Sequence, residues 1–93
     1  MKKALKTQIK EIMNFDGTEE LRFVTEKKIS TFTQLDFVYI DSGLIRAMVS
    51  FHYREFTERL ELWHFVSVES FFPDFVYNRI INGVKLFNDG GVR

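Results

Sequence analysis

The side chains best suited to chemistry lie in one segment, between residues 52 and 64. The chain has 2 histidines, His52 and His64, and Glu55, Glu58 and Glu61 stand between them. Two imidazoles and a carboxylate are ligands that zinc accepts, and bound zinc activates water for hydrolysis. On a β-hairpin, an even sum of paired residue numbers would put both histidines on one face, and an odd sum would separate them. Neither register supplies the third ligand of a zinc site, so we predict no metal.

Other candidate catalytic groups lack the surroundings that catalysis needs. The glutamates have the spacing of a solvated turn, whereas paired-carboxylate catalysis needs a cleft that no pattern here indicates. The serines lie outside any nucleophile-elbow pattern. With 0 Cys there is no thiolate nucleophile, and no glycine-rich loop is placed to bind phosphate. We therefore expect a protein that is not an enzyme and uses no cofactor.

The length and the charge of the chain limit the classes of protein to which it can belong. The 93 residues suffice for a single domain over residues 1–93, and the 45% of hydrophobic residues can supply its core. The 13 basic residues balance the 13 acidic ones, which gives no support to strong electrostatic binding of nucleic acid. Lys2, Lys3 and Lys6 precede no signal-peptide-like apolar segment, and no apolar run approaches the roughly 20 residues that cross a bilayer. We expect a cytoplasmic domain without membrane contact.

The segment from residue 44 to residue 68 contains two adjacent predicted strands, Leu44–Tyr53 and Leu60–Val68. In the first, apolar side chains alternate with Arg46, Ser50 and His52. Alternation with a period of two, rich in β-branched and aromatic residues, is typical of a half-buried strand. The link between the strands is short enough to make the pair an antiparallel hairpin. The other segments can extend or cover this hairpin.

Periodicity and turn residues place the segments that precede the hairpin. The N-terminal one is an amphipathic helix, because its apolar residues fall on one stripe at helical spacing. That stripe consists of Leu5, Ile9, Ile12 and Met13. Gly17 suits a left-handed cap or turn after this helix. The expected segments are a helix over Lys2–Phe15, a strand over Thr18–Thr25, a charged turn over Glu26–Lys28, a strand over Ile29–Ile40 and a tight turn over Asp41–Gly43.

Residues 72–89 admit two readings, a helix or a hairpin. A helix would have Ser70 as its N-cap and Pro73 in its first turn, where the missing N–H does no harm. Its apolar stripe would be Phe72, Val76, Ile80, Val84 and Phe87. A hairpin would use Asn82-Gly83 as a type I′ turn. We favour the helix, since the alternation around Asn82-Gly83 is imperfect and a mid-helix Gly costs only about 1 kcal/mol.

These segments predict an α+β fold with the element order α-β-β-β-β-α. Short links join the strands and no helix crosses between them, so they should form a four-stranded antiparallel meander. The sheet should be flanked by an N-terminal and a C-terminal helix that pack on one of its faces.

The register of the hairpin decides which side chains the opposite sheet face presents. Hydrophobic matching favours an odd sum of paired residue numbers, with Glu55–Glu58 as the link. This register buries Ile45, Ala47, Val49, Phe51, Tyr53, Leu60, Leu62, Val66 and Val68. It leaves Met48, Trp63 and Phe65 on the opposite face, among Arg46, Ser50, His52 and Glu61. A slip of one residue would instead send Trp63 and Phe65 into the core.

The predicted face has the composition of a protein interface, in which an apolar patch with a polar rim is rich in Trp, Met, Phe and Arg. We therefore expect a non-enzymatic protein-interaction module, a small inhibitor or adaptor that binds a larger protein or forms a homodimer. Its partner-binding residues would be Trp63, Phe65, Met48, Arg46, His52 and Glu61. The composition, rich in Lys, Phe, Ile and Asn, suits an inhibitor encoded by a phage or a mobile element.

Single-stranded nucleic-acid binding is the alternative function. Trp63 and Phe65 on an open sheet would stack on bases, each stack contributing about 1–3 kcal/mol. This face has few cations that could bind the phosphates. Arg46 lies on it, and Arg22, Arg54 and Arg59 stand at strand ends. We expect a protein partner rather than nucleic acid for this reason.

Overall fold

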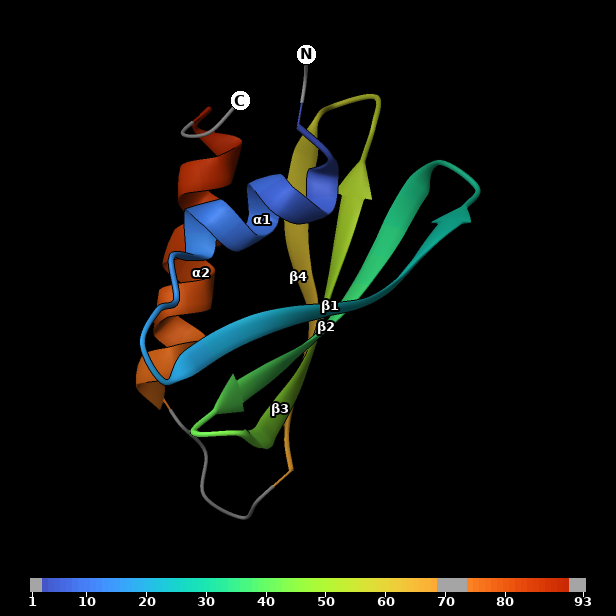
Figure 1. The fold of residues 1–93 in the computed structure, drawn as a ribbon. Helices are drawn as coiled ribbons and strands as arrows, with labels where there is room; N and C mark the ends of the chain where they lie inside the picture. The colour runs from blue at the N-terminus through green and yellow to red at the C-terminus, as the bar shows by residue number, and fades with distance from the viewer. Residues whose placement is uncertain (1–2, 69–73, 91–93) are drawn as a thin grey trace.

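A four-stranded antiparallel sheet with one helix before it and one after it forms the fold (Figure 1). The computed structural model describes residues 3–68 and 74–90. Their elements are α1 (Leu5–Met13), β1 (Glu19–Ile29), β2 (Phe32–Asp41), β3 (Leu44–Arg54), β4 (Arg59–Ser67) and α2 (Asp74–Asn88). The strands lie in the order β1-β2-β3-β4, which confirms the predicted α+β meander. Within the described residues, neither helix combines the length and apolar character that a membrane span requires.

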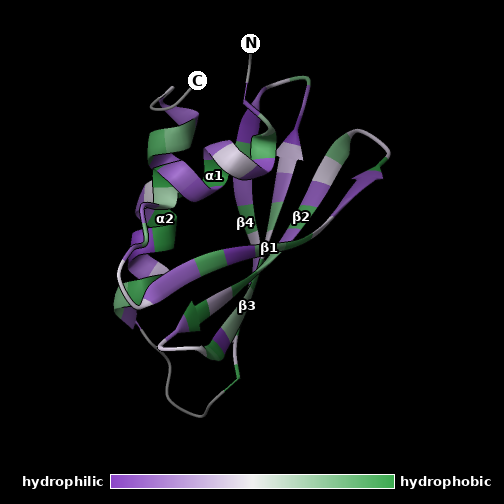
Figure 2. Ribbon diagram, in the orientation of Figure 1, coloured by the Kyte–Doolittle hydropathy of each residue, from purple (hydrophilic) through white to green (hydrophobic). Residues whose placement is uncertain are grey.

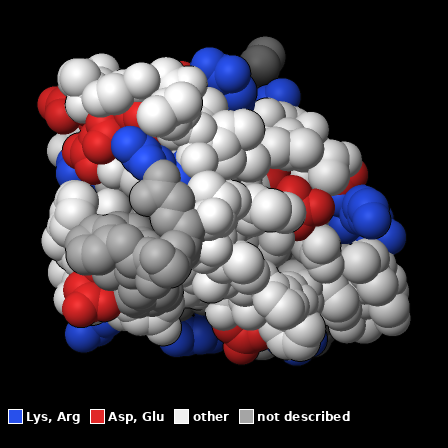
Figure 3. Space-filling model, turned by 90° about the horizontal axis from the view of Figure 1, so that it is seen from below, with Lys and Arg blue, Asp and Glu red and all other residues white. Residues whose placement is uncertain are grey.

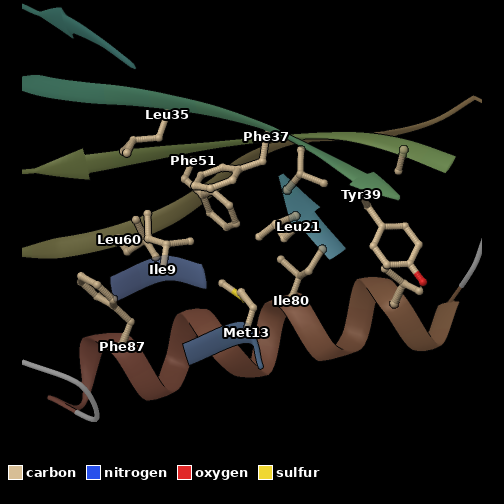
Figure 4. Packing of buried hydrophobic residues seen from close by; sticks show 13 residues of the cluster. Ile9, Met13, Leu21, Leu35, Phe37, Tyr39, Phe51, Leu60, Ile80 and Phe87 are labelled. Atoms are coloured by element: carbon tan, nitrogen blue, oxygen red, sulfur yellow. The ribbon is translucent and has the colours of Figure 1, made fainter. Parts of the chain in front are cut away.

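Both helices lie on one side of the strongly twisted sheet (Figure 1). Figure 2 shows hydrophilic and hydrophobic residues alternating along the strands, as the sequence pattern predicts. The inward-facing side chains of both layers meet in one core (Figure 4), whose buried residues are Ile9, Met13, Leu21, Leu35, Phe37, Tyr39, Ala47, Val49, Phe51, Leu60, Val76, Ile80 and Phe87. The sheet face away from α1 and α2 is called the outer face below.

Helix α1 buries the predicted stripe but is shorter than predicted. Ile9 and Met13 are buried, and Leu5 and Ile12 pack partly against the core. The helix ends where Asn14 adopts the left-handed conformation, with φ 57°, and its backbone N–H donates to the Lys10 carbonyl. Asn tolerates this conformation better than most residues. The helix therefore ends at Met13 rather than at Phe15, and Gly17 lies in the turn that follows.

The C-terminal segment is the predicted helix, α2, and the alternative hairpin does not form. Val76, Ile80 and Phe87 of the predicted stripe are buried, and Val84 is partly buried. The first part of the predicted helix lies outside the described residues. This part contains the predicted N-cap Ser70 as well as Phe72 and Pro73. Gly83 faces α1, and a Cβ added to it would lie 2.4 Å from the Met13 sulfur. The glycine therefore permits a close approach of the two helices.

The predicted charged turn at Glu26–Lys28 is wrong, because these residues belong to β1. They pair with Leu35, Gln34 and Thr33 of β2, and the turn consists of Ser30 and Thr31. Ser30 takes the positive φ of 54° that a tight hairpin needs. Strand β1 is an edge strand, so its charged side chains stay in solvent while its backbone pairs on one side. The predicted turn after Asp41 is confirmed, with Ser42 and Gly43 both at positive φ.

The predicted pairing of β3 with β4, in which paired residue numbers have an odd sum, is confirmed next to the turn that joins them. It is wrong in the part of the strands farther from that turn. Phe51 pairs with Leu62 and Tyr53 with Leu60, with the predicted link Glu55–Glu58. A β-bulge then shifts the pairing, so that Ser50 lies opposite His64. The extra residue reverses the side-chain alternation of β4, because successive side chains point to opposite faces. Phe65 consequently packs partly against the core, whereas Val66 and Val68, predicted as buried, are each 51% exposed.

The predicted burial of Ile45 is wrong because of a second bulge, which lies in β3 where it pairs with β2. Tyr39 pairs with Ala47 and Ile40 with Ile45, which leaves Arg46 as the extra residue of β3. Ile45 is therefore turned away from the core and is 52% exposed, although the alternation predicts burial. The predicted burial of Ala47, Val49 and Phe51 is confirmed.

Candidate functional site: the outer sheet face

The side chains of the outer face fall into rows that cross the strands. At one end, Phe32, His52 and Trp63 form a group called here the aromatic ladder. Asp36, Ser50 and His64 make a polar row across the middle. The other end is apolar, where Val38, Met48 and Val66 stand on neighbouring strands with Ile45 and Val68 beyond them. The two bulges turn Val66, Val68 and Ile45 to this face, on which Trp63, the extra residue of the β4 bulge, also lies.

The aromatic ladder is a stack of rings from three neighbouring strands. The His52 ring centroid lies 4.3 Å from that of Phe32 on β2 and 4.3 Å from that of Trp63 on β4. Because β3 runs between β2 and β4, the two rings flank the imidazole on opposite sides. The indole is nearly parallel to the imidazole, at 18°, and the His64 ring meets the indole edge-on at 5.3 Å. The stack holds Trp63 in place although the residue is 52% exposed.

A chain of hydrogen bonds fixes the orientation of His52. The Asp36 carboxylate accepts from the Ser50 hydroxyl at 2.7 Å and from the Gln34 amide nitrogen at 3.1 Å. The Gln34 carbonyl oxygen then faces His52 Nε2 at 3.2 Å. An amide carbonyl only accepts hydrogen bonds, so Nε2 carries the proton of the neutral imidazole.

His52 is buried although the sheet face around it is open. The residue is 5% exposed. Burial lowers the pKa of the His52 imidazole below its ordinary value, and the nearby Glu61 carboxylate opposes this effect. The ring is therefore neutral at physiological pH.

The apolar end of the outer face exposes more hydrophobic surface than a scattered residue would. Met48 is 56% exposed and lies directly opposite Val66. On the β1 side, Arg22 and Glu20 form an ion pair at 3.1 Å that borders this end. Figure 3, seen from the end that carries the β2–β3 turn, shows Lys, Arg, Asp and Glu at the margin of a broad area formed by all other residue types, polar and apolar together. An apolar area with a charged margin is typical of an interaction surface.

The structure brings most of the predicted partner-binding residues to the outer face. Met48, Trp63, His52 and Glu61 lie on it, and Arg46 is the bulge residue at its apolar end. Phe65 does not, since its ring packs edge-on against Tyr77 of α2 at 5.5 Å. Phe32 belongs to the aromatic ladder, and the sequence analysis missed it.

The histidines share the outer face but gather no third ligand. Within residues 3–68 and 74–90, no three His, Cys, Asp or Glu side chains come together in a way that would hold a metal ion. A shallow hollow lies elsewhere, on the helix side of the molecule, and Glu26, Glu55 and Glu58 are among its lining residues. Lys28 bonds to Glu55 and neutralises part of this acidity, which lowers the pKa of the Glu55 carboxyl.

Fold and face together define a small α+β domain with one open sheet face. A comparison of the chain with protein-family models, with curated proteins and with solved structures finds no significant match.

Proposed function

We propose that this chain is a non-enzymatic protein-interaction domain, a small inhibitor or adaptor, and that its outer face binds a larger protein or a second copy of the chain. The observation that carries the proposal is the exposure of large apolar side chains on the sheet face that the helices leave open, with half-exposed Trp63 at its aromatic end and half-exposed Met48 and Val66 at its apolar end. Trp and Met are enriched in interface cores, and a polar rim like that of Arg46 and Glu61 commonly surrounds them.

Trp63 is the best candidate for a binding hot spot. Its stacking on His52 restricts the indole before any partner binds, so little side-chain entropy remains to be lost. It is also flanked by His64, which would exclude water from its edge in a complex. A central aromatic residue of this kind typically contributes about 2 kcal/mol or more to binding.

Substitution of Trp63 tests the proposal, with Phe56 as the matched control. Phe56 is 99% exposed, but it lies in the β3–β4 turn and not on the outer face. We expect Trp63→Ala to weaken self-association or capture of a protein partner by about 30-fold or more, and Phe56→Ala to leave both nearly unchanged. Light scattering after size exclusion at two concentrations measures the first, and quantitative pull-down measures the second.

The same variants define the result that would overturn the proposal. We expect Trp63→Ala to fold, because the Trp63 side chain lies outside the core. Circular dichroism checks this before binding is measured. If the folded variant associates with itself and with its partner as the wild type does, the outer face is not the binding surface.

Binding of single-stranded nucleic acid is the second candidate function, and the aromatic ladder favours it. Arg54 lies over the Phe32 ring at 5.6 Å, so a cation stands beside one ring of the aromatic ladder. Against it, both faces of the His52 ring are already covered by Phe32 and Trp63. A mobility shift with oligonucleotides that weakens steeply with salt would support this candidate, because phosphate contacts release counterions.

A further inference from the structure

We infer that an arginine pair beside the aromatic ladder receives the carboxylates of a protein partner, so that the outer face binds an acidic segment of another protein. The arginine pair consists of Arg54 and Arg59. The inference rests on the proposed function and names the chemistry of the partner that this face fits.

Arg54 and Arg59 lie directly opposite each other on β3 and β4, next to the turn that joins these strands. Both residues are exposed. Because Arg54 lies over the Phe32 ring, the pair is on the same sheet face as the aromatic ladder. Like charges directly opposite on neighbouring strands repel each other and are destabilising. An anion between them removes this repulsion, and a guanidinium presents N–H donors that match the two oxygens of a carboxylate.

The protein's own carboxylates leave the arginine pair available. Among residues 3–68 and 74–90, neither Arg54 nor Arg59 forms an ion pair. The neighbouring Lys28 differs, because it points to the helix side of the sheet and forms an ion pair with Glu55. At this end of the sheet a cation is therefore neutralised on the helix side, while the arginine pair on the outer face can accept an external anion.

The charge around the arginine pair is positive although the whole chain has a formal net charge of +0. The row next to the pair runs from Lys27 through Gln34 and His52 to Glu61. Three cations therefore stand against one carboxylate in these two rows. Complementary potentials favour an acidic partner. A second copy packed through the same face would instead place like charges opposite each other.

The position of Glu61 favours an acidic protein segment over a nucleic acid. Arg59, Glu61 and Trp63 follow one another along the same face of β4. A chain of phosphates that reached from the arginine pair to the indole would pass the Glu61 carboxylate and be repelled by it. A protein segment can place a carboxylate at the pair and uncharged or basic groups beside Glu61 and Trp63.

Fluorescence anisotropy with a labelled oligoglutamate peptide tests the inference on the full chain. An oligothymidylate of equal charge is the second probe, because it offers phosphates in place of carboxylates. The double variant Arg54→Gln/Arg59→Gln removes the arginine pair. Its matched control is Lys10→Gln/Lys85→Gln, which removes two exposed positive charges from the helices and leaves the same net charge.

We expect the oligoglutamate to bind the wild type more tightly than the oligothymidylate does. Arg54→Gln/Arg59→Gln should weaken its binding by about 10-fold, whereas Lys10→Gln/Lys85→Gln should change it by less than about 2-fold. Equal weakening by both double variants would overturn the inference, because it would reflect net charge alone. Tighter binding of the oligothymidylate would also overturn it, as would self-association of the wild type that Arg54→Gln/Arg59→Gln abolishes.

The single variant Arg59→Gln separates binding from stability. It relieves the repulsion across the strands, so urea denaturation should give a free energy of unfolding no lower than that of the wild type. A clear loss of stability would assign Arg59 a structural role and contradict the inference. The effect of Trp63→Ala on partner binding tests the proposed function separately, since the oligoglutamate measurements require no protein partner.

Discussion

At Gly83 the backbone of α2 lies against a side chain of α1. A Cβ at this position would lie 2.4 Å from the Met13 sulfur and 3.1 Å from its methyl carbon. Met13 is 2% exposed and belongs to the core, so it has little room to move away. The absence of a side chain at residue 83 is therefore a packing requirement of the helix pair, and it outweighs the low helix propensity of glycine.

We predict that Gly83→Ala destabilises the protein by up to about 2 kcal/mol. Overpacking costs typically 1–3 kcal/mol, and the better helix propensity of Ala returns only about 1 kcal/mol. Urea denaturation followed by circular dichroism measures the difference. Asn82→Ala is the control, because Asn82 is exposed on the same helix and its replacement should leave stability nearly unchanged.

The contact with Met13 can be tested by a second substitution. Met13→Ala removes the atoms that a new Cβ would meet, so Gly83→Ala should be less harmful, or even stabilising, in that background. Equal effects of Gly83→Ala in both backgrounds would show that the close contact is not the cause.

Between whole elements, two polar side chains of α2 bind it to the rest of the fold. Arg79 contacts Glu19 of β1 at 3.4 Å, donates to the Asn14 carbonyl after α1, and lies over the Phe15 ring. Glu19 also accepts from the Tyr39 hydroxyl at 2.6 Å, and burial together with this bond raises the Tyr39 pKa. At the other end of α2, Asn88 bonds to the backbone of Leu60. These contacts orient the helix where apolar packing alone would allow it to slide.

Asn88 protects one end of the edge strand β4. Its side-chain oxygen accepts from the Leu60 N–H at 2.7 Å, and its side-chain nitrogen donates to the Leu60 carbonyl at 2.9 Å. Leu60 lies on a strand with β3 on one side only, so these backbone groups would otherwise face the open edge. The amide therefore takes the place that a neighbouring strand would occupy.

We predict that Asn88→Ala lowers the free energy of unfolding by about 1–3 kcal/mol, because two partly buried backbone groups lose their partners. Asn88→Asp keeps the acceptor for the N–H but faces the Leu60 carbonyl with a second acceptor, so it should also be destabilising. Hydrogen exchange of the Leu60 amide gives a local readout. If that amide exchanges equally fast in the wild type and in Asn88→Ala, the bond contributes nothing to protection.

The sequence predicted the elements well and their registers only in part. The helical stripe over Val76, Ile80 and Phe87 and the turn at Gly43 rest on local patterns, and both are confirmed. The extra residues Arg46 and Trp63 depend on how whole strands fit across the sheet, which no local pattern states. Each bulge reverses the side-chain alternation beyond it. Phe65, Val66 and Ile45 were therefore assigned to the wrong face, although Met48 and Trp63 were assigned to the right one.

The stability of the whole molecule should depend on pH in two separate windows. The pKa of His52 is lowered by burial below its ordinary 6.5, so the unfolded chain binds more protons than the folded one as pH falls below this value. The free energy of unfolding then decreases with falling pH, by at most about 1.4 kcal/mol per pH unit for one proton. The pKa values of Glu20 and Glu55 are lowered from 4.5 by their bonds to Arg22 and Lys28, so a second loss begins below that pH.

We predict that urea denaturation at a series of pH values resolves the two windows, and that His52→Gln abolishes only the upper one. The Gln side chain does not titrate, so the difference in proton uptake between the folded and unfolded chains disappears above pH 4.5. His64→Gln is the matched control, because it removes an exposed histidine from the same face and should keep the slope that belongs to His52. A wild-type stability that stays flat from pH 6.5 down to 4.5 would mean that His52 is as readily protonated in the folded protein as in the unfolded chain. The folded protein would then accommodate the charged His52 ring without any cost in stability.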